Sequence, residues 1–283
     1  MAQRGIEIKK RQQLRVMRQA GLVVARTHQR IGEAVKPGVT TGDLEQIARD
    51  VLAEHGAGSS FLNYGAGWGI PPYPAVTCIS TNDEIVHGIP GDRVLNEGDI
   101  VSVDFGAIIN GWHGDAARTF FVGEVSDEVR ELSRVTEESM WAGIGAARLG
   151  GRIGDISHAI ESFIDARKRP DGGDWGIIRE YTGHGIGSQM HQAPDVPNWG
   201  RPGRGPKLVE GMVIAIEPMV TLGTEDTVTL DDEWTVVTAD KTWASHWENT
   251  VTVTRKGLWV LTLEDGGEAE LTKRGLPFGP LAD

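Results

Sequence analysis

The sequence predicts an α+β fold built by duplication, with helices packed on one face of a largely antiparallel, curved sheet. Residues 97–104 and 210–217 share one order: Glu-Gly, then an apolar run, then a carboxylate. Upstream, the Gly-Asp pairs at 42–43 and 154–155 each open a helix-like run, and both lie at nearly the same distance before those carboxylates. A helix-then-strand unit that occurs twice indicates one sheet to which both halves contribute.

The predicted elements follow the same order in each half. Helical spacing of apolar residues opens both halves, and a loop rich in Gly, Pro and aromatic residues follows the first pair of helices. This loop either walls a pocket with Phe61, Tyr64, Trp68 and Tyr73 or is a surface loop packed by its own aromatics. The predicted helices are 13–34, 42–55, 129–147 and 156–167, the loop is 56–74, and the later strands are 177–182, 212–221, 234–238 and 247–254.

A β-hairpin is predicted between the first helix pair and the second. Residues 100–109 and 112–122 flank Asn-Gly, a pair that favours the positive φ angles of a type I′ turn. With residues 109 and 112 beside the turn, Asp104 faces Ala117 and Asp115 faces Gly106. The two aspartates are then diagonal neighbours on one face, with Cβ atoms roughly 7 Å apart, which suits carboxylates that converge on cations.

The repeat favours one domain, 1–283, with halves of about 1–130 and 131–283 joined around 125–138. No Pro/Ser-rich or charged linker separates the halves. If both halves contribute to one sheet and one site, neither half is expected to fold alone.

Charge and cysteine content exclude several classes of protein. The chain has 28 basic and 40 acidic residues and a formal charge of -12, which opposes the phosphate attraction that drives nucleic-acid binding. Cys78 is the only cysteine, so no internal disulfide forms. Because there is neither a membrane-length apolar run nor a signal-peptide core, we expect a cytoplasmic protein without a membrane partner.

Carboxylates and histidines in unusual settings indicate a metal site. Asp104 and Glu217 are each predicted to end a buried strand, where an acid is costly unless a cation meets it. The complete set is Asp104, Asp115, Glu217 and Glu248 with His87, His184 and His191. More than three carboxylates around one ion are excessive, so two divalent ions roughly 3.5 to 4 Å apart are expected. Such sites occur in aminopeptidases, phosphatases and nucleases, and the spacing does not choose among these.

The chain resembles type I methionine aminopeptidases, which have the duplicated pita-bread fold with helices on the outer face of a curved antiparallel sheet. The resemblance runs from about Ile6 to Val260, and no single motif carries it. Its carriers, in order, are Val86-His87-Gly88-Ile89-Pro90; Val103-Asp104-Phe105-Gly106; His113-Gly114-Asp115 to Arg118-Thr119-Phe120; Gly183-His184-Gly185-Ile186-Gly187 to His191; Ile216-Glu217-Pro218-Met219; and Glu248-Asn249-Thr250.

The resemblance implies a role for each member of the metal set. Asp104 would chelate one ion, Asp115 and Glu248 would bridge both, and His184 with Glu217 would complete the other. The ions are Co, Mn, Fe, Zn or Ni. They would activate a water that attacks the first peptide bond of a new protein, removing the initiator methionine when the second residue is small.

Two histidines are implied to act on substrate rather than on metal. His87 and His191 match family histidines that hydrogen-bond the amide nitrogen and the carbonyl oxygen, although either could merely shape its loop. Glu217 is implied to shuttle a proton as well as to bind metal.

The implied methionine pocket includes Tyr73, Cys78 and Trp234, joined by Ile70 and Met190 at positions that are often aromatic in relatives. Cys78 is expected to be a wall rather than a nucleophile, because no paired base is apparent. Relatives commonly carry His where this chain has Asn249, but that side chain should face away from Glu248 on a strand. His246, on the same face as Glu248, either orients that carboxylate or has a plain structural role.

Two competing functions remain at this stage. An Xaa-Pro dipeptidase or aminopeptidase of the same fold usually has a large extra N-terminal domain, for which no room is seen before Met17. A non-catalytic binding protein on this fold would be expected to have lost ligands. The resemblance also implies nascent polypeptides as substrate, a transient ribosome contact, action after peptide deformylase in bacteria, and a monomeric state.

Overall fold

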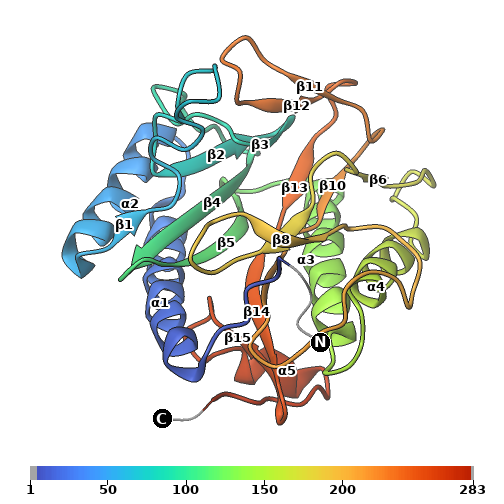
Figure 1. Ribbon diagram of the computed structural model, residues 1–283. Helices are drawn as coiled ribbons and strands as arrows, with labels where there is room; N and C mark the ends of the chain where they lie inside the picture. Colours follow the sequence, from blue (N-terminus) through green and yellow to red (C-terminus); the bar gives the residue numbers. More distant parts are fainter. Residues whose placement is uncertain (1–4, 282–283) are drawn as a thin grey trace.

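The computed structural model describes residues 5–281, in which two pairs of helices flank a set of antiparallel strands (Figure 1). Helices α1 (Arg11–Ala34) and α2 (Thr41–His55) lie on one side, and α3 (Asp127–Ala146) and α4 (Ile153–Asp165) lie on the other. The short α5 (Glu268–Lys273) lies near the end of the chain. This arrangement confirms the predicted α+β, pita-bread architecture. The predicted single domain 1–283 stays a prediction, and its two ends lie outside the described residues.

Local capping explains where the predicted helices begin. The Thr40 hydroxyl accepts from the Asp43 amide, and the Asp43 carboxylate accepts from the Thr40 amide, so α2 opens with a capping box. Gly56 ends this helix with a φ of 59°, in the left-handed region that favours glycine. Ser126 caps α3 at the Val129 amide, so α3 begins two residues before its predicted start.

The strands form four hydrogen-bonded sheets where the sequence predicted one, and only the third of them joins strands of both halves. All of the strand pairs among residues 5–281 are antiparallel, as predicted for most of them. The first sheet contains β1 (Gly58–Ser59), β4 (Ile100–Ile109) and β2 (Thr77–Thr81), with β5 (Trp112–Phe121) paired to β4; the second contains β13 (Ala244–His246), β10 (Met219–Thr221) and β6 (Gly176–Ile177). The third contains β11 (Thr227–Thr229), β12 (Val236–Thr238) and β3 (Glu84–Val86); the fourth contains β15 (Gly257–Val260), β14 (Asn249–Thr254), β9 (Val213–Ile216), β7 (Gly183–Gly185) and β8 (Gln192–Val196).

The hairpin of β4 and β5 has the predicted register. Asp104 pairs with Ala117 and Gly106 pairs with Asp115, without a bulge. One part of the prediction was wrong: Asp104 does not end its strand but lies within it, because β4 continues to Ile109 before the turn. Both aspartates therefore lie within unbroken strands of the hairpin.

All four of the later predicted strands are shorter or broken; 234–238, for example, is reduced to β12. Of 177–182, only Ile177 lies in a strand, because β6 meets β10 through two residues alone. The run 212–221 is divided into β9 and β10 around Glu217-Pro218, and 247–254 begins in a break between β13 and β14 at Glu248. β9 and β14 belong to the fourth sheet, whereas β10 and β13 belong to the second. Glu217 and Glu248 thus lie where two neighbouring strands pass from one sheet to the next.

Two large apolar clusters hold the helices against the strands. Val24 of α1 and Ala48 of α2 pack in one cluster with Val103 of β4. Ile144 of α3 packs in the other with Val251 of β14. The helices are thereby fixed to the sheets on both sides, and the polar residues of the hairpin and broken strands lie between them.

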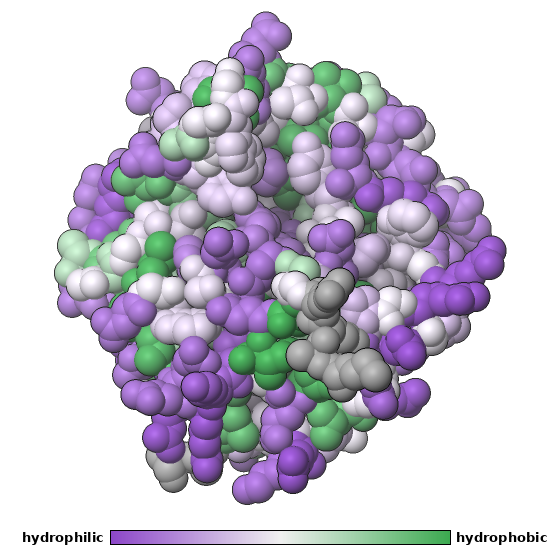
Figure 2. Space-filling model, viewed as in Figure 1, coloured by the Kyte–Doolittle hydropathy of each residue, from purple (hydrophilic) through white to green (hydrophobic). Residues whose placement is uncertain are grey.

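Figure 2 shows one face of the molecule, on which hydrophilic residues predominate and apolar residues form scattered patches. Within residues 5–281, no helix is both long enough and apolar enough to cross a membrane.

Candidate metal centre and its cavity

A cavity of about 310 Å³ lies where the broken strands meet the hairpin. It brings together side chains from every motif singled out in the sequence. The predicted site residues that line it are Tyr73, Cys78, His87, Asp104, Asp115, His184, Met190, His191, Glu217, Trp234 and Glu248. Ile70 is not among the lining residues; it is partly buried at the edge of the apolar cluster that contains Tyr73 and Trp234.

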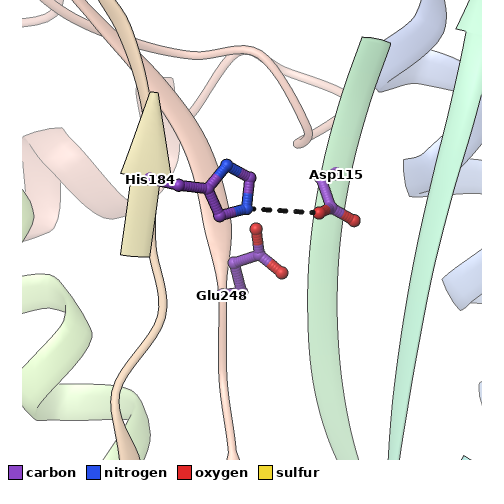
Figure 3. Close-up of side chains that lie close together, drawn as sticks. All are labelled: Asp115, His184 and Glu248. Atoms are coloured by element: carbon purple, nitrogen blue, oxygen red, sulfur yellow. Dashed lines mark ion pairs between the residues drawn. The ribbon is translucent and has the colours of Figure 1, made fainter. Parts of the chain in front are cut away.

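Three side chains form the centre of this cavity. Asp115 on β5, His184 on β7 and Glu248 each present a ligand atom within 4.8 Å of the others. Figure 3 shows the three pointing toward one another from separate segments of the chain. His184 Nε2 lies 3.9 Å from Asp115 Oδ2 and 3.4 Å from Glu217 Oε1, so Glu217 adjoins the same group.

The orientation of His184 suits a metal ligand. Its Nδ1 lies 3.0 Å from the Gly185 carbonyl oxygen, which only accepts, so Nδ1 carries the hydrogen and Nε2 has its lone pair toward the carboxylates. Burial lowers the pKa of His184 to about 3, which keeps the imidazole neutral. Close backbone packing holds the strand, because a Cβ at Gly185 would lie 2.2 Å from the Ala193 carbonyl oxygen.

Several oxygens of the carboxylates lack partners. Among the described residues, Asp104 Oδ1, Asp115 Oδ1 and Glu248 Oε1 are buried without a hydrogen bond. Buried polar atoms are rarely left so, since each costs about 1–3 kcal/mol or more when charged. These oxygens are therefore arranged for a group that supplies positive charge.

Mutual repulsion and burial shift the carboxylate pKa values upward. Burial, with Glu217 nearby, raises the pKa of Asp104 to about 7. Burial raises the pKa of Asp115 well above its usual range, and the charge of Asp104 adds to this effect. Burial likewise raises the pKa values of Glu217 and Glu248. Four such acids bind divalent cations well because the cation relieves the repulsion.

The donor set fits hard or borderline divalent metals. Carboxylate oxygens with one neutral imidazole and no thiolate are the ligands expected for Mn²⁺, Fe²⁺, Co²⁺ or Zn²⁺. Cys78 lines the cavity, but burial raises the pKa of its thiol well above the usual value. The thiol is therefore protonated at neutral pH, as expected of a wall residue.

The two remaining predicted histidines flank the centre. His87 follows β3 with a φ of 60°, an uncommon conformation for a residue other than glycine. Its ring contacts Tyr181 and Trp234 edge-on, at centroid distances of 5.4 and 6.3 Å. His191 lies beside His184, with ring centroids 4.2 Å apart.

His246 faces a different carboxylate from the one that its sequence position suggested. Its Nε2 lies 3.6 Å from Glu217 Oε2 and has no hydrogen-bond partner among the described residues. The carboxylate it faces is thus Glu217, whereas the sequence suggested Glu248. The strand break at Glu248 accounts for this difference, since it disturbs the simple alternation of faces.

The structure also adds residues to the site. Phe61, Tyr64 and Trp68 line the cavity, so the aromatic loop walls a pocket, which was the first of its two interpretations. Tyr181 and Met219 line it as well and were not predicted. Their only sequence signal is position: Tyr181 precedes the Gly183–Gly185 motif closely, and Met219 follows Glu217-Pro218.

Comparisons with known proteins agree with this geometry. The family model for metallopeptidase family M24 matches residues 15–255. The methionine aminopeptidase of Clostridium acetobutylicum is 49% identical over 259 residues, covering 91% of this chain and 99% of the relative. Methionine aminopeptidase 1 of Mycobacterium tuberculosis is 51% identical over 252 residues, covering 89% of this chain and 92% of the relative.

Solved structures of methionine aminopeptidases and of prolidases both match this chain, with higher sequence identity for the methionine aminopeptidases. The methionine aminopeptidase of Thermotoga maritima matches with a TM-score of 0.86 and 38% identity, covering 92% of this chain and 100% of that one. The prolidase of Pyrococcus furiosus matches with a TM-score of 0.70 and 21% identity, covering 90% of this chain and 65% of that one, and shares the fold alone. The chain therefore belongs to metallopeptidase family M24, among its methionine aminopeptidases.

Proposed function

We propose that this enzyme removes the initiator methionine from new cytoplasmic proteins whose second residue is small. One observation carries the proposal: the carboxylates and the imidazole lie in the same cavity as a wall of apolar side chains. Tyr73, Cys78, Met190 and Trp234 provide this wall in the same cavity as Asp115 and its neighbours. Aromatic and sulfur-containing side chains suit the thioether of methionine.

Five side chains would hold two divalent ions: Asp104, Asp115, His184, Glu217 and Glu248. The unpartnered carboxylate oxygens support this assignment. When bound, such ions supply Lewis acidity toward a carbonyl group and a nucleophilic water at neutral pH. Which ions are bound depends both on the affinity of the site for each metal and on the availability of that metal in the cell, so Mn²⁺, Fe²⁺ and Co²⁺ are all included in the test.

The protein's own groups position the substrate between the metal centre and the wall. His87 and His191 line the same cavity and would donate hydrogen bonds to the first peptide bond of a bound methionyl peptide. Glu217, which lies 3.4 Å from His184 Nε2 at the centre, is placed to take up a proton and pass it to the leaving amine. The substrate must present a free amine, so a formylated chain would first need a deformylase.

The test is methionine release from Met-Ala-Ser by chelator-treated protein. Mn²⁺, Fe²⁺ or Co²⁺ is then added without oxygen, and Xaa-Pro peptides are assayed alongside. Release of methionine that returns with metal supports the proposal. Cleavage of the Xaa-Pro peptides alone, or no cleavage with any metal, would overturn it.

A second assay tests the roles of the pocket and of His87. Peptides that begin with Leu or norleucine should be cleaved less efficiently than the methionyl peptide, because the wall is shaped for a thioether. His87→Ala should reduce turnover and leave the metal content unchanged. Loss of metal in that variant would instead make His87 a ligand.

A further inference from the structure

Tyr64 and His191, which both line the cavity, contact each other directly. Its hydroxyl lies 2.6 Å from His191 Nδ1, although the two residues are 127 positions apart in the sequence. The two rings also meet edge-on, with centroids 5.1 Å apart. A hydrogen bond and a ring contact between the same pair constrain both the position and the rotation of the imidazole.

The loop around Tyr64 is built to hold this side chain still. The Tyr64 amide donates to the Phe61 carbonyl at 2.8 Å, and its own carbonyl accepts from the Tyr73 amide at 2.9 Å. Trp68 packs edge-on against the Tyr64 ring at 5.1 Å. The next residue, Gly65, has a φ of 76° and approaches the Trp234 ring so closely that a Cβ would lie 2.9 Å from it.

The segment around His191 is held from the opposite side. The Glu7 carboxylate accepts from the Ser188 amide at 3.0 Å and from Gln192 Nε2 at 2.9 Å. Glu7 therefore ties down the chain on both sides of His191. Hydrogen bonds therefore hold the backbone at or beside both Tyr64 and His191.

The distance indicates which partner donates. Bonds in which an N–H donates have a typical separation of about 2.9–3.0 Å, whereas O–H donors give shorter bonds. The tautomer of His191 sets the two roles, and a separation of 2.6 Å, below the usual range of about 2.7–3.2 Å for N–H donors, favours the phenol as donor and Nδ1 as acceptor. No other hydrogen bond of the Tyr64 hydroxyl occurs among residues 5–281, so nothing competes for its hydrogen. A neutral imidazole that accepts at Nδ1 carries its hydrogen on Nε2.

We propose that Tyr64 is a positioning residue that holds His191 in the Nε2–H tautomer, so that His191 donates to the carbonyl oxygen of the bond being cleaved. The donation from His191 to the carbonyl oxygen rests on the proposed peptidase function, whereas the hydrogen bond to Tyr64 and the tautomer do not. In the other tautomer Nε2 would be an acceptor and would repel a carbonyl oxygen. Tyr64 thereby selects the chemically useful form of His191 before substrate binds.

The first experiment is a long-range ¹H–¹⁵N correlation spectrum of the histidine side chains in chelator-treated protein at about pH 8, where an ordinary histidine is neutral. His191 signals are assigned by their loss in His191→Asn. The wild type should show a protonated Nε2 and an unprotonated Nδ1, and Tyr64→Phe should show both tautomers. Tyr181→Phe is the matched control, because it removes a cavity phenol whose ring contacts His87 and which, among residues 5–281, has no hydrogen bond to His191, and it should leave His191 unchanged.

Steady-state kinetics supply the second readout. Tyr64→Phe keeps the ring, so KM for Met-Ala-Ser should change little while kcat falls about tenfold, the effect of one lost hydrogen bond in the transition state. An Nδ1–H tautomer in the wild type, an unchanged tautomer in Tyr64→Phe, or an unchanged kcat would each overturn the inference. If the tautomer behaves as expected but no methionine is released by any form, the proposed function fails and the tautomer assignment stands.

Discussion

Glu248 and Asn249 are consecutive residues that face two very different polar regions. Glu248 belongs to what we name the front face, the carboxylates Asp104, Asp115, Glu217 and Glu248. Asn249 belongs to the rear layer, which consists of Arg118, Met140, Asn249 and Thr262. Both regions are largely buried, yet the front face has unpartnered oxygens whereas the side-chain oxygen and nitrogen of Asn249 both have partners.

The rear layer is satisfied atom by atom. Asn249 Oδ1 accepts from Arg118 at 2.7 Å and from Thr262 Oγ1 at 2.9 Å, and its Nδ2 donates to the Met140 sulfur at 3.4 Å. Arg118 also donates to the Ala117 carbonyl at 2.7 Å and to the backbone carbonyl of Glu248. The Asn249 side chain therefore lies among Arg118, Met140 and Thr262 and not among the carboxylates, in agreement with the prediction that it faces away from Glu248.

The contrast shows how one buried segment serves two purposes. A buried polar group without a partner lowers stability, so several unpartnered carboxylate oxygens in one cavity indicate that a ligand supplies the partner. A satisfied network contributes stability and order. Changes on the front face should therefore reduce activity without unfolding the protein. Changes in the rear layer should lower the free energy of unfolding and leave activity nearly unchanged.

The largest effect is expected from Glu248→Gln. This substitution keeps the size of the side chain but removes a charged metal ligand, so kcat/KM for methionine release should fall about a thousandfold, equivalent to roughly 4 kcal/mol. Because it also removes repulsion between carboxylates, the metal-free variant should be more stable than the metal-free wild type at neutral pH. Peptide assays, metal analysis and urea unfolding check the three parts. A metal-free variant less stable than wild type would break the comparison.

Arg118→Met should have the next largest effect, on stability. It removes the cation that bonds the Glu248 carbonyl and Asn249, and should lower the free energy of unfolding by about 3 kcal/mol. Urea unfolding measures this change. The matched control is Arg130→Met, since Arg130 pairs with the exposed Glu124 at the surface and should cost less than about 1 kcal/mol. Equal losses in the two variants would show that the rear layer has no special role.

The stability of the metal-free protein should depend on pH in an unusual direction. Burial raises the pKa of Asp104 to about 7, so the folded protein holds a proton that the unfolded chain releases near pH 4. As far as this group is concerned, stability is then greatest below about pH 4 and falls as pH rises from there through about 7, by on the order of 4 kcal/mol in all. Urea midpoints at pH 5 and pH 8, with and without metal, test this, and added metal should remove the fall. A midpoint that rises with pH in the metal-free protein would contradict the crowded front face.

Asn249→Ala should give the smallest effect. Arg118 keeps its bonds to two backbone carbonyls in this variant, so the free energy of unfolding should fall by only about 1–2 kcal/mol. Methionine release should stay within about threefold of wild type, because the front face is untouched. A loss of activity as large as that of Glu248→Gln would mean that the rear layer acts in catalysis.

Local rules predicted the hairpin and its aspartates but not the broken strands. Asn110-Gly111 sets the turn, and a two-residue turn sets every pair beyond it, so the register of Asp104 and Asp115 follows from nearby residues. The breaks at Glu217 and Glu248 depend on where each strand leaves one sheet for another. That choice is made by distant partners such as β6 and β7, which no local pattern specifies.

The sequence by itself determined the α+β class, the family and the charged centre of the cavity with much of its wall, because short motifs and their spacing are local properties. Only the tertiary structure decided which atoms meet: Tyr64 with His191, His246 with Glu217, and Arg118 with the backbone of Glu248. These pairs join segments that are distant in sequence, and their geometry depends on the crossing of sheets and the packing of loops. A linear pattern can name the participants, but the distance and direction between side chains exist only after the chain has folded.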